Sequence, residues 1–196
     1  MRRLPLALLI SIVTLVTTAA AALALPNPAN SSVDPCLVVC PIGHIAFNVT
    51  VRDLANNPIQ NSVVQIDFCS ISVVDLCFTS ACSMSGFTNS AGQVTINVQA
   101  GGASSTTLAS IRADGVLLAT RPVAAVDQNG DLIVNGSDVN TVNLLVGSTN
   151  GGADFDCDGL VTPTDVAFVQ AHVGHTCGGP VELKPGTWGG MKSIYR

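Results

Sequence analysis

The chain has 196 residues, with 13 acidic and 8 basic side chains and a formal net charge of −5. This acidic balance argues against nucleic acid or an anionic membrane surface as a partner. Seven cysteines in a chain of this length are typical of disulfide bonding in an oxidising compartment, with one thiol left over.

Residues 1–24 have the organisation of a secretory signal peptide. Arg2 and Arg3 precede an apolar run, and Ala22 and Ala24 supply the small residues of a cleavage site. A membrane anchor is the alternative, but the apolar run is shorter than the ~20 residues that a span requires. We therefore expect a secreted protein, extracellular or at the cell surface, with no membrane span once the signal is removed.

Four runs of residues have the character of β-strands. They alternate apolar and polar residues or are rich in Val, Ile and Thr, and turn residues such as Asn, Gly and Pro separate them. No helical period of ten residues interrupts them. The sequence therefore predicts a mainly β fold, with an antiparallel sandwich over residues 42–125. The four runs are residues 44–53, 62–70, 92–100 and 108–126.

Two stretches of this region resemble a known family. VTVRDLANNPIQNSVVQIDF (49–68) followed by TNSAGQVTI (88–96) is similar to bacterial immunoglobulin-like domains and, to a similar degree, to transthyretin-like domains. Those families share a strand ending in Asp, a Pro-containing turn, a second strand and a later Gly-containing turn. The resemblance implies an immunoglobulin-like sandwich and carries little information about activity.

Five of the cysteines lie in the sandwich region or in the N-terminal segment 25–41 that precedes it. The insertion CSISVVDLCFTSAC (69–82) is expected to form a loop pinned by one or two disulfides. A zinc site is the alternative, but the spacing is irregular and contains no Cys-x-x-Cys pair. The five cysteines are Cys36, Cys40, Cys69, Cys77 and Cys82.

Two windows of twelve residues, DQNGDLIVNGSD and DFDCDGLVTPTD, place oxygen-bearing side chains at the same positions. Positions 1, 3, 5, 7, 9 and 12 are the ligand positions of an EF-hand loop, and an all-oxygen set favours calcium over zinc or copper. The candidate ligands of the first loop are Asp127, Asn129, Asp131, the backbone carbonyl of Ile133, Asn135 and Asp138. Those of the second loop are Asp154, Asp156, Asp158, the backbone carbonyl of Leu160, Thr162 and Asp165.

Three further features bear on these loops. Residues 126–177 contain seven acidic residues and no Lys or Arg, so a compact fold of this segment needs a counter-ion. Position 6 requires a sharp turn, which Gly159 allows, whereas Leu132 in the first loop costs about 1 kcal/mol there. We therefore expect two calcium sites, of which the second is better formed. Val134 and Val161 at position 8 supply apolar side chains that pair the loops.

One amphipathic run follows each loop, and neither loop has a helix before it. This arrangement resembles a type I dockerin domain over residues 127–176 and gives a module spanning 126–177. The resemblance implies a pair of helices, calcium-dependent folding, and docking to a cohesin domain of a scaffold protein in polysaccharide-degrading assemblies. It also implies partner-binding roles for Ser137 and Thr164. A structural clip set by calcium, with no partner, is the alternative.

Cys157 lies at loop position 4, where side chains point away from the ion, so it is not expected to be a ligand. Its expected disulfide partner is Cys177 in the same module, provided that the intervening helix is short enough for a disulfide to form. His172 and His175 stand near Cys177, and we interpret both as surface or packing residues rather than metal ligands.

Catalytic signatures are missing from the sequence. It shows no nucleophile–base motif, and the acidic side chains of the sandwich region are scattered rather than paired. These acids are Asp53, Asp67, Asp75 and Asp114. The tail, residues 178–196, is expected to pack back on the protein or to act as an attachment signal.

We therefore predict a secreted, non-catalytic bacterial protein that binds calcium and has a structural or docking role. A carbohydrate-binding accessory protein, with the calcium loops as a clip, is the alternative. Exposed aromatic side chains would be expected on such a sandwich. Its four phenylalanines, which we expect to be mostly buried, are Phe47, Phe68, Phe78 and Phe87.

Overall fold

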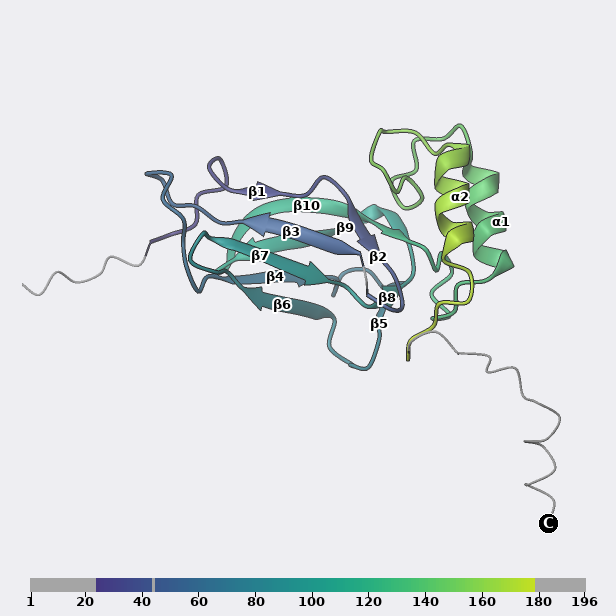
Figure 1. The fold of residues 1–196 in the computed structure, drawn as a ribbon, viewed down its shortest axis with the longest axis horizontal. Helices are drawn as coiled ribbons and strands as arrows, with labels where there is room; N and C mark the ends of the chain where they lie inside the picture. Colours follow the sequence, from purple (N-terminus) through teal and green to yellow (C-terminus); the bar gives the residue numbers. More distant parts are fainter. Residues whose placement is uncertain (1–23, 44, 179–196) are drawn as a thin grey trace, which may run out of the picture.

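Ten strands and two helices make up the computed structural model, which describes residues 24–43 and 45–178 (Figure 1). The predicted signal peptide up to residue 23 and the tail from residue 179 lie outside the described residues. The strands are β1 (Ser32–Val33), β2 (Leu37–Val39), β3 (Ala46–Thr50), β4 (Val63–Asp67), β5 (Asp75–Leu76), β6 (Ser83–Phe87), β7 (Gln93–Asn97), β8 (Ala100–Gly101), β9 (Ser104–Ala113) and β10 (Val116–Ala125). The helices are α1 (Gly136–Leu145) and α2 (Pro163–Ala171).

The strands form a sandwich. A three-stranded sheet in the order β1-β3-β7 faces a five-stranded sheet in the order β2-β10-β9-β4-β6, and β5 and β8 form a small separate pair. Neighbouring strands are antiparallel except β2 and β10, which run parallel. The mainly β, sandwich-like fold class is therefore confirmed, with a small two-helix part at the C-terminal end.

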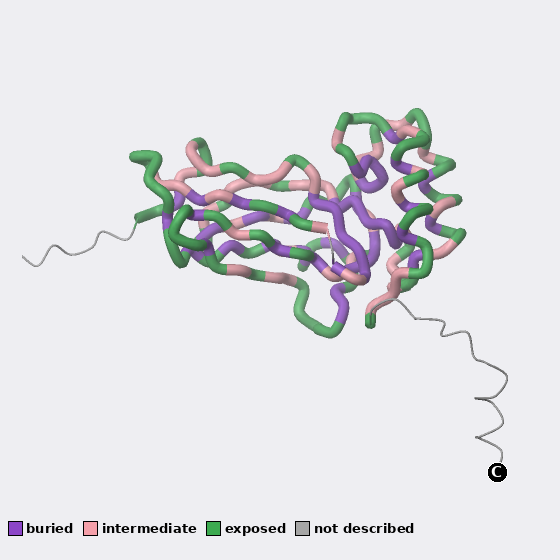
Figure 2. Tube along the Cα trace, viewed as in Figure 1, coloured by how far each residue is buried: buried purple, intermediate pink, exposed green. Residues whose placement is uncertain are grey.

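Alternation of side chains along the strands builds the core of the sandwich. Phe47 and Val49 of β3 are buried and alternate with exposed or half-buried neighbours, as do Val64 and Ile66 of β4. Successive side chains of a strand point to opposite faces, so each strand gives its apolar residues to the space between the sheets. Figure 2 shows this space as the buried interior of the sandwich.

The run over residues 108–126 is a hairpin rather than one strand. Asp114 and Gly115 connect β9 and β10 with φ values of +46° and +83°. Two consecutive residues with positive φ are typical of the type I′ turn, whose twist matches that of the flanking strands.

A second hydrophobic core joins the sandwich to the helices. Val38 of β2, Ala124 of β10 and Val126 pack in one buried cluster with the interior of the helical part. The helices α1 and α2 contact each other at this end of the sandwich (Figure 1). The members from the helical part are Val134, Val142, Ala153, Phe155, Val161 and Val169.

Disulfides reinforce the same junction. Cys36 is bonded to Cys157 and Cys77 to Cys177, so two bridges connect the sandwich with the helical part. The predicted Cys157–Cys177 pair is therefore wrong, because α2 separates the two residues and each faces a different part of the sandwich.

The third disulfide, Cys69–Cys82, closes the insertion between β4 and β6, as expected for a pinned loop. Cys40 is a buried free thiol. Four of the five cysteines in this part of the chain are thus disulfide-bonded. Three disulfides indicate an oxidising, extracellular environment. Within residues 24–43 and 45–178, no helix is long and apolar enough to cross a membrane.

The expectation that the phenylalanines are mostly buried is half wrong. Phe47 and Phe68 are buried, whereas Phe78 and Phe87 are 74% and 70% exposed. Phe78 lies in the irregular loop after β5, where its φ is +63°. Phe87 lies directly opposite Val63, an outward-facing residue of β4, and therefore points to solvent.

Truncation of Phe155 tests the second core. Its ring stacks on Phe168 with centroids 5.1 Å apart, and the side chain is buried. We expect Phe155→Ala to lower the free energy of unfolding by about 3–5 kcal/mol, measured by chemical denaturation. Leu144→Ala on the solvent face of α1, where Leu144 is 84% exposed, is the matched control and should change it by less than about 0.5 kcal/mol. Equal effects of the two changes would contradict the assignment of this core.

Candidate metal centre

The two loops share one hydrogen-bonded scaffold. At position 1, Asp127 Oδ2 accepts from the N–H of Leu132 at 2.7 Å, and Asp154 Oδ2 accepts from the N–H of Gly159 at 2.9 Å. In each loop the donor is the residue at position 6. The chain therefore turns back on its first aspartate in both repeats, as a loop that wraps a cation must.

The carboxylates at position 12 are held by backbone donors and also cap the helices. Asp165 Oδ1 accepts from the N–H of Phe155 at 2.7 Å, and Asp165 Oδ2 accepts from the N–H of Thr162 at 2.8 Å. Thr162 is the N-cap of α2 and forms a capping box with Asp165, so the helix begins at Pro163, inside the loop. The first loop has the same bonds, from the N–H of Gln128 to Asp138 Oδ1 (2.9 Å) and from the N–H of Asn135 to Asp138 Oδ2 (2.8 Å).

The valines at position 8 link each loop to the opposite repeat. Val134 exchanges backbone hydrogen bonds with Gly174 and His175, which follow α2. Val161 bonds in the same way to Gly147 and Ser148, which follow α1. Both valines are fully buried in the second core, so each loop is fixed to the end of the other repeat's helix.

Three carboxylates converge in the second loop. Ligand oxygens of Asp154, Asp156 and Asp158 all lie within 4.8 Å of one another. Asp154 is only 6% exposed, and its Oδ1 atom is buried without a hydrogen-bond partner. Burial raises the pKa of Asp154 above its usual value. A buried carboxylate oxygen that lacks a partner and has two carboxylates beside it is costly unless a cation compensates it. The donor set thus fits a hard cation.

The first loop differs in how its position-1 carboxylate, Asp127, is hydrogen-bonded. Both oxygens of the buried Asp127 are used, since Oδ1 accepts from the N–H of Gly130 at 2.9 Å and Oδ2 from that of Leu132. Asn129 donates its amide to Asp131 Oδ2 at 3.1 Å. In the described part of the chain, the three carboxylates of this loop form no converging group.

The sandwich covers the first loop. A Cβ atom added to Gly101 of β8 would overlap Asp127 Oδ2, and two backbone N–H groups hold this carboxylate in place, so the position favours glycine. Burial raises the pKa of Asp127 to about 6, although the N–H donors of Leu132 and Gly130 oppose the shift. Leu132 has a φ of +65°, the left-handed conformation that favours glycine. The structure thus places Leu132 in the backbone conformation expected from its loop position.

The remaining candidate ligands lie around the loops. The side chains of Ile133 and Leu160 are exposed, which is compatible with a role for their carbonyls alone. The carbonyl of Ile133 accepts from the Asn135 amide at 3.2 Å, and the Thr162 hydroxyl donates to Asp165 Oδ2 at 3.1 Å. The side chains of Asn135 and Thr162 also accept from the N–H groups of Ser137 and Thr164, so both residues serve as helix N-caps.

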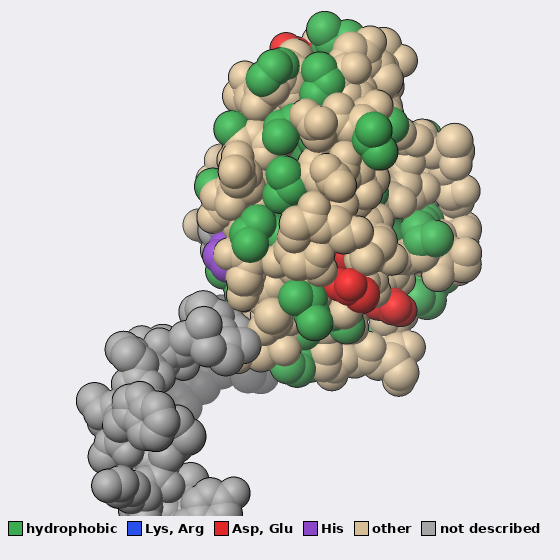
Figure 3. Space-filling view, turned by 90° about the vertical axis from the view of Figure 1, so that its right-hand side faces the viewer, with side chains coloured by type: hydrophobic (Ala, Val, Ile, Leu, Met, Phe, Trp, Pro, Cys, Tyr) green, Lys and Arg blue, Asp and Glu red, His purple; other side chains and the backbone are tan. Residues whose placement is uncertain are grey.

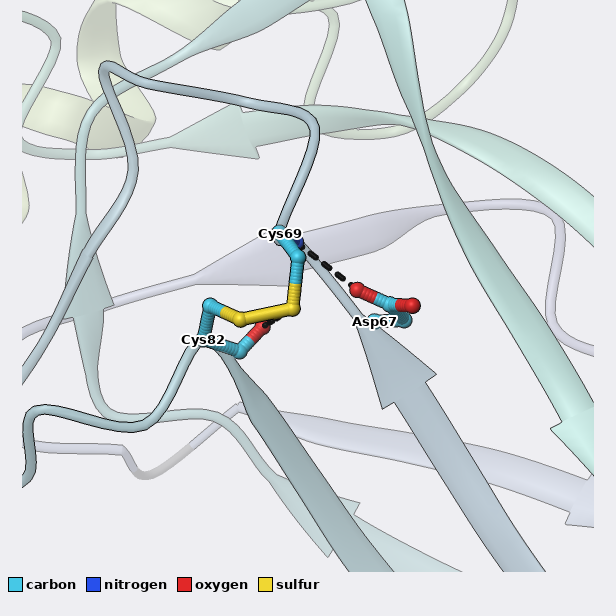
Figure 4. Close-up of side chains that lie close together, drawn as sticks. All are labelled: Asp67, Cys69 and Cys82. Atoms are coloured by element: carbon cyan, nitrogen blue, oxygen red, sulfur yellow. Dashed lines mark hydrogen bonds between the residues drawn. A yellow bond between two sulfur atoms is a disulfide. The ribbon is translucent and has the colours of Figure 1, made fainter.

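A second group with metal-ligand atoms lies at the edge of the sandwich. It consists of Asp67, Cys69 and Cys82 (Figure 4). The two sulfur atoms are bonded to each other, and Asp67 Oδ1 accepts from the N–H of Cys69 at 2.7 Å. While the disulfide is intact, the group offers a cation only one carboxylate.

The histidines near the C-terminal end are engaged in packing. His172 is buried, has its Nδ1 atom 2.6 Å from the Phe168 carbonyl oxygen, and lies against the Phe168 ring. His175 Nδ1 lies 3.4 Å from Cys40 Sγ, in the second core. Within residues 24–43 and 45–178, neither histidine belongs to a metal-ligand group.

Sequence reasoning missed one residue of this centre. Cys36, which lies 121 positions before Cys157, is bonded to position 4 of the second loop. Cys157 has a φ of +56°, so the bridge is attached where the loop backbone is left-handed. The sequence shows that Cys157 lies between two aspartates, but no local signal identifies its partner.

Comparison of the chain with protein-family models, with curated proteins and with solved structures found no match.

The raised pKa of Asp127 gives a prediction for pH dependence. In calcium-free protein, Asp127 keeps its proton up to about pH 6, whereas an unfolded aspartic acid loses it near pH 4. The free energy of unfolding should therefore fall as the pH rises from about 4 to 6. We expect a shallower fall for Asp127→Asn, measured by chemical denaturation in the presence of a chelator. An unchanged slope would contradict this account of the first loop.

Proposed function

We propose that the chain is a secreted, non-catalytic bacterial protein whose dockerin-like module binds calcium and is fixed by it to an immunoglobulin-like sandwich. One observation carries the proposal: Asp154 Oδ1 is buried and unpaired among the converging carboxylates of the second loop. The first loop is the weaker of two calcium sites in this proposal, because Asp127 already has backbone partners for both oxygens.

The chemistry of the donors supports calcium in particular. Calcium takes six to eight oxygen ligands in flexible geometry, and loops of twelve residues with carboxylates at positions 1, 3 and 5 provide them. Residues 126–177 contain no Lys or Arg that could neutralise the acids from within the module. When bound, the cation supplies that positive charge. The residues of the loop orient the oxygens through the N–H donors that also shape the turn.

A structural role follows from how the module is attached. The second core is shared with β2 and β10, and two disulfides cross the same junction. Binding of calcium by the folded module alone therefore stabilises the junction as well as the loop. This supports a structural role, in which calcium stabilises the junction without any partner protein, as the simplest function of the module.

Calcium titration with thermal unfolding tests the proposal. A ligand at 100 times its Kd adds about 2.7 kcal/mol. For a protein of this size we therefore expect a rise in Tm of about 5–10 °C with millimolar calcium. Asp154→Asn should remove most of the rise, because it replaces the oxygen that lacks a partner. Asp75→Asn, at the exposed residue of β5, is the matched control and should keep the full rise. No rise for the unaltered protein would rule out the metal assignment.

The same module can also dock a partner, and we propose a cohesin-type scaffold protein for this role. Ser137 and Thr164, in the first turns of α1 and α2, are exposed and are not covered by the sandwich. Figure 3 shows the side of the molecule where the helices lie, with dispersed hydrophobic side chains, a group of acidic ones and no visible Lys or Arg. Such a surface suits a partner that contributes apolar contacts and basic residues.

Carbohydrate binding is the second candidate function, and the exposure of Phe87 favours it. Phe87 and Val63 form an exposed apolar pair on the outer face of the five-stranded sheet. On the same face, Gln65 of β4 lies opposite Arg112 of the neighbouring β9. A single aromatic ring beside amide and guanidinium groups can contact the apolar face of a sugar and its hydroxyls.

A binding screen against immobilised cohesin domains and polysaccharides separates the two candidates. We expect calcium-dependent retention on a cohesin surface, lost at least tenfold in Ser137→Asp/Thr164→Asp because two charges enter the contact. Phe87→Ala, on the sandwich, is the matched control and should retain cohesin binding. Retention by a polysaccharide that is lost in Phe87→Ala and unaffected by chelator would instead support the second candidate.

A further inference from the structure

Cys157 occupies a position in the second loop from which it can control the metal-binding oxygens. It lies between Asp156 and Asp158, two of the three converging carboxylates, and its backbone is left-handed. Its Cα atom is 5.7 Å from that of Cys36. The middle of the loop is therefore tied at one point to a distant part of the chain.

The other end of the bridge is rigidly placed. Cys36 immediately precedes β2, whose three residues are all buried. This strand pairs with β10 in register, Leu37 with Val123 and Val39 with Ala125. Because β2 is fixed in the sheet, the disulfide also fixes the backbone at loop position 4.

Two effects oppose the closed loop, and the bridge acts against both. Three carboxylates with oxygens within 4.8 Å repel one another before a cation binds. A left-handed backbone at a residue other than glycine also costs on the order of 1 kcal/mol. A loop that is free to open would relieve both the repulsion and the backbone strain. Calcium would then have to close the loop on binding, and the free-energy cost of closing would lower its affinity.

We propose that the Cys36–Cys157 disulfide makes the calcium affinity of the second loop depend on thiol redox state, and that calcium in turn protects this disulfide from reduction. The inference rests on the proposed calcium function. Reduction by a dithiol breaks the S–S bond and forms two thiols, while the dithiol gives up two electrons and two protons and becomes a disulfide. Because coupling between two equilibria is reciprocal, the factor lost in calcium affinity equals the factor gained in protection.

The three disulfides provide internal controls. Cys36 and Cys157 are both partly exposed, so a dithiol can reach their bridge. Cys69 and Cys82 are exposed at the edge of the sandwich and are outside the module (Figure 4). Cys77–Cys177 also crosses the junction, but it holds the end of the module rather than a calcium loop.

Calcium affinity of paired serine variants is the first test, by isothermal titration calorimetry on the whole protein. We expect Cys36→Ser/Cys157→Ser to bind calcium about tenfold more weakly at the second loop, within the usual range of coupling between sites. Cys69→Ser/Cys82→Ser should bind as the unaltered protein does, and Cys77→Ser/Cys177→Ser should lose less than the first variant. Unchanged affinity in the first variant, or an equal loss in the Cys69/Cys82 variant, would overturn the inference.

The second test needs no substitution and therefore does not depend on a variant that folds. The unaltered protein is equilibrated with dithiothreitol, with calcium or with chelator, and its thiols are alkylated and located by mass spectrometry. Calcium should lower the reduced-to-oxidised ratio of Cys36–Cys157 about tenfold and leave that of Cys69–Cys82 unchanged. Equal protection of both bridges would contradict the inference. If the unaltered protein binds no calcium, the proposed function fails; if it binds but reduction of Cys36–Cys157 is unaffected, only the redox coupling fails.

Discussion

The burial of Asp154 is the constraint on which the C-terminal module depends. Its carboxylate lies beside the second core, receives one backbone N–H and leaves the other oxygen without a partner. A charge in that position needs compensation, and the nearest side chains of the loop are themselves acidic. The turn of the second loop closes on this carboxylate, and the position-12 carboxylate of the same loop, Asp165, caps α2, so neutralising Asp154 would stabilise the loop and the start of the helix together.

Most of the fold follows from local patterns. Alternation of apolar residues predicts the central strands, since a half-buried sheet requires a period of two. The two aspartate-rich loops could be recognised in the sequence because position 6 must be left-handed and the cap residues must accept N–H bonds, as Leu132, Asn135 and Thr162 illustrate. These features depend only on residues a few positions apart.

Features that depend on distant residues were not predictable in the same way. The sequence offers six other cysteines as partners for Cys157, and only the packing of β2 beside β10 brings Cys36 to it. Phe87 has the apolar character of a core residue, and its exposure is decided by its register with Val63 on the outer face. The packing of Gly101 beneath Asp127 likewise joins two segments that no local pattern connects.

The two loops share the same backbone turn but differ in what surrounds the carboxylate at position 1. In the first loop, both oxygens of Asp127 accept hydrogen bonds from backbone N–H groups and are covered by β8. The conformation of this loop is therefore held by contacts within the protein. In the second loop, Asp154 keeps an oxygen free and the sandwich reaches the loop through a disulfide instead. A disulfide restrains the backbone without supplying hydrogen-bond donors to the carboxylates, and so leaves them available to a cation. Leu132 and Gly159 adopt the same left-handed turn, but the first loop is also held by the close approach of Gly101 to Asp127, which explains why a leucine is tolerated there.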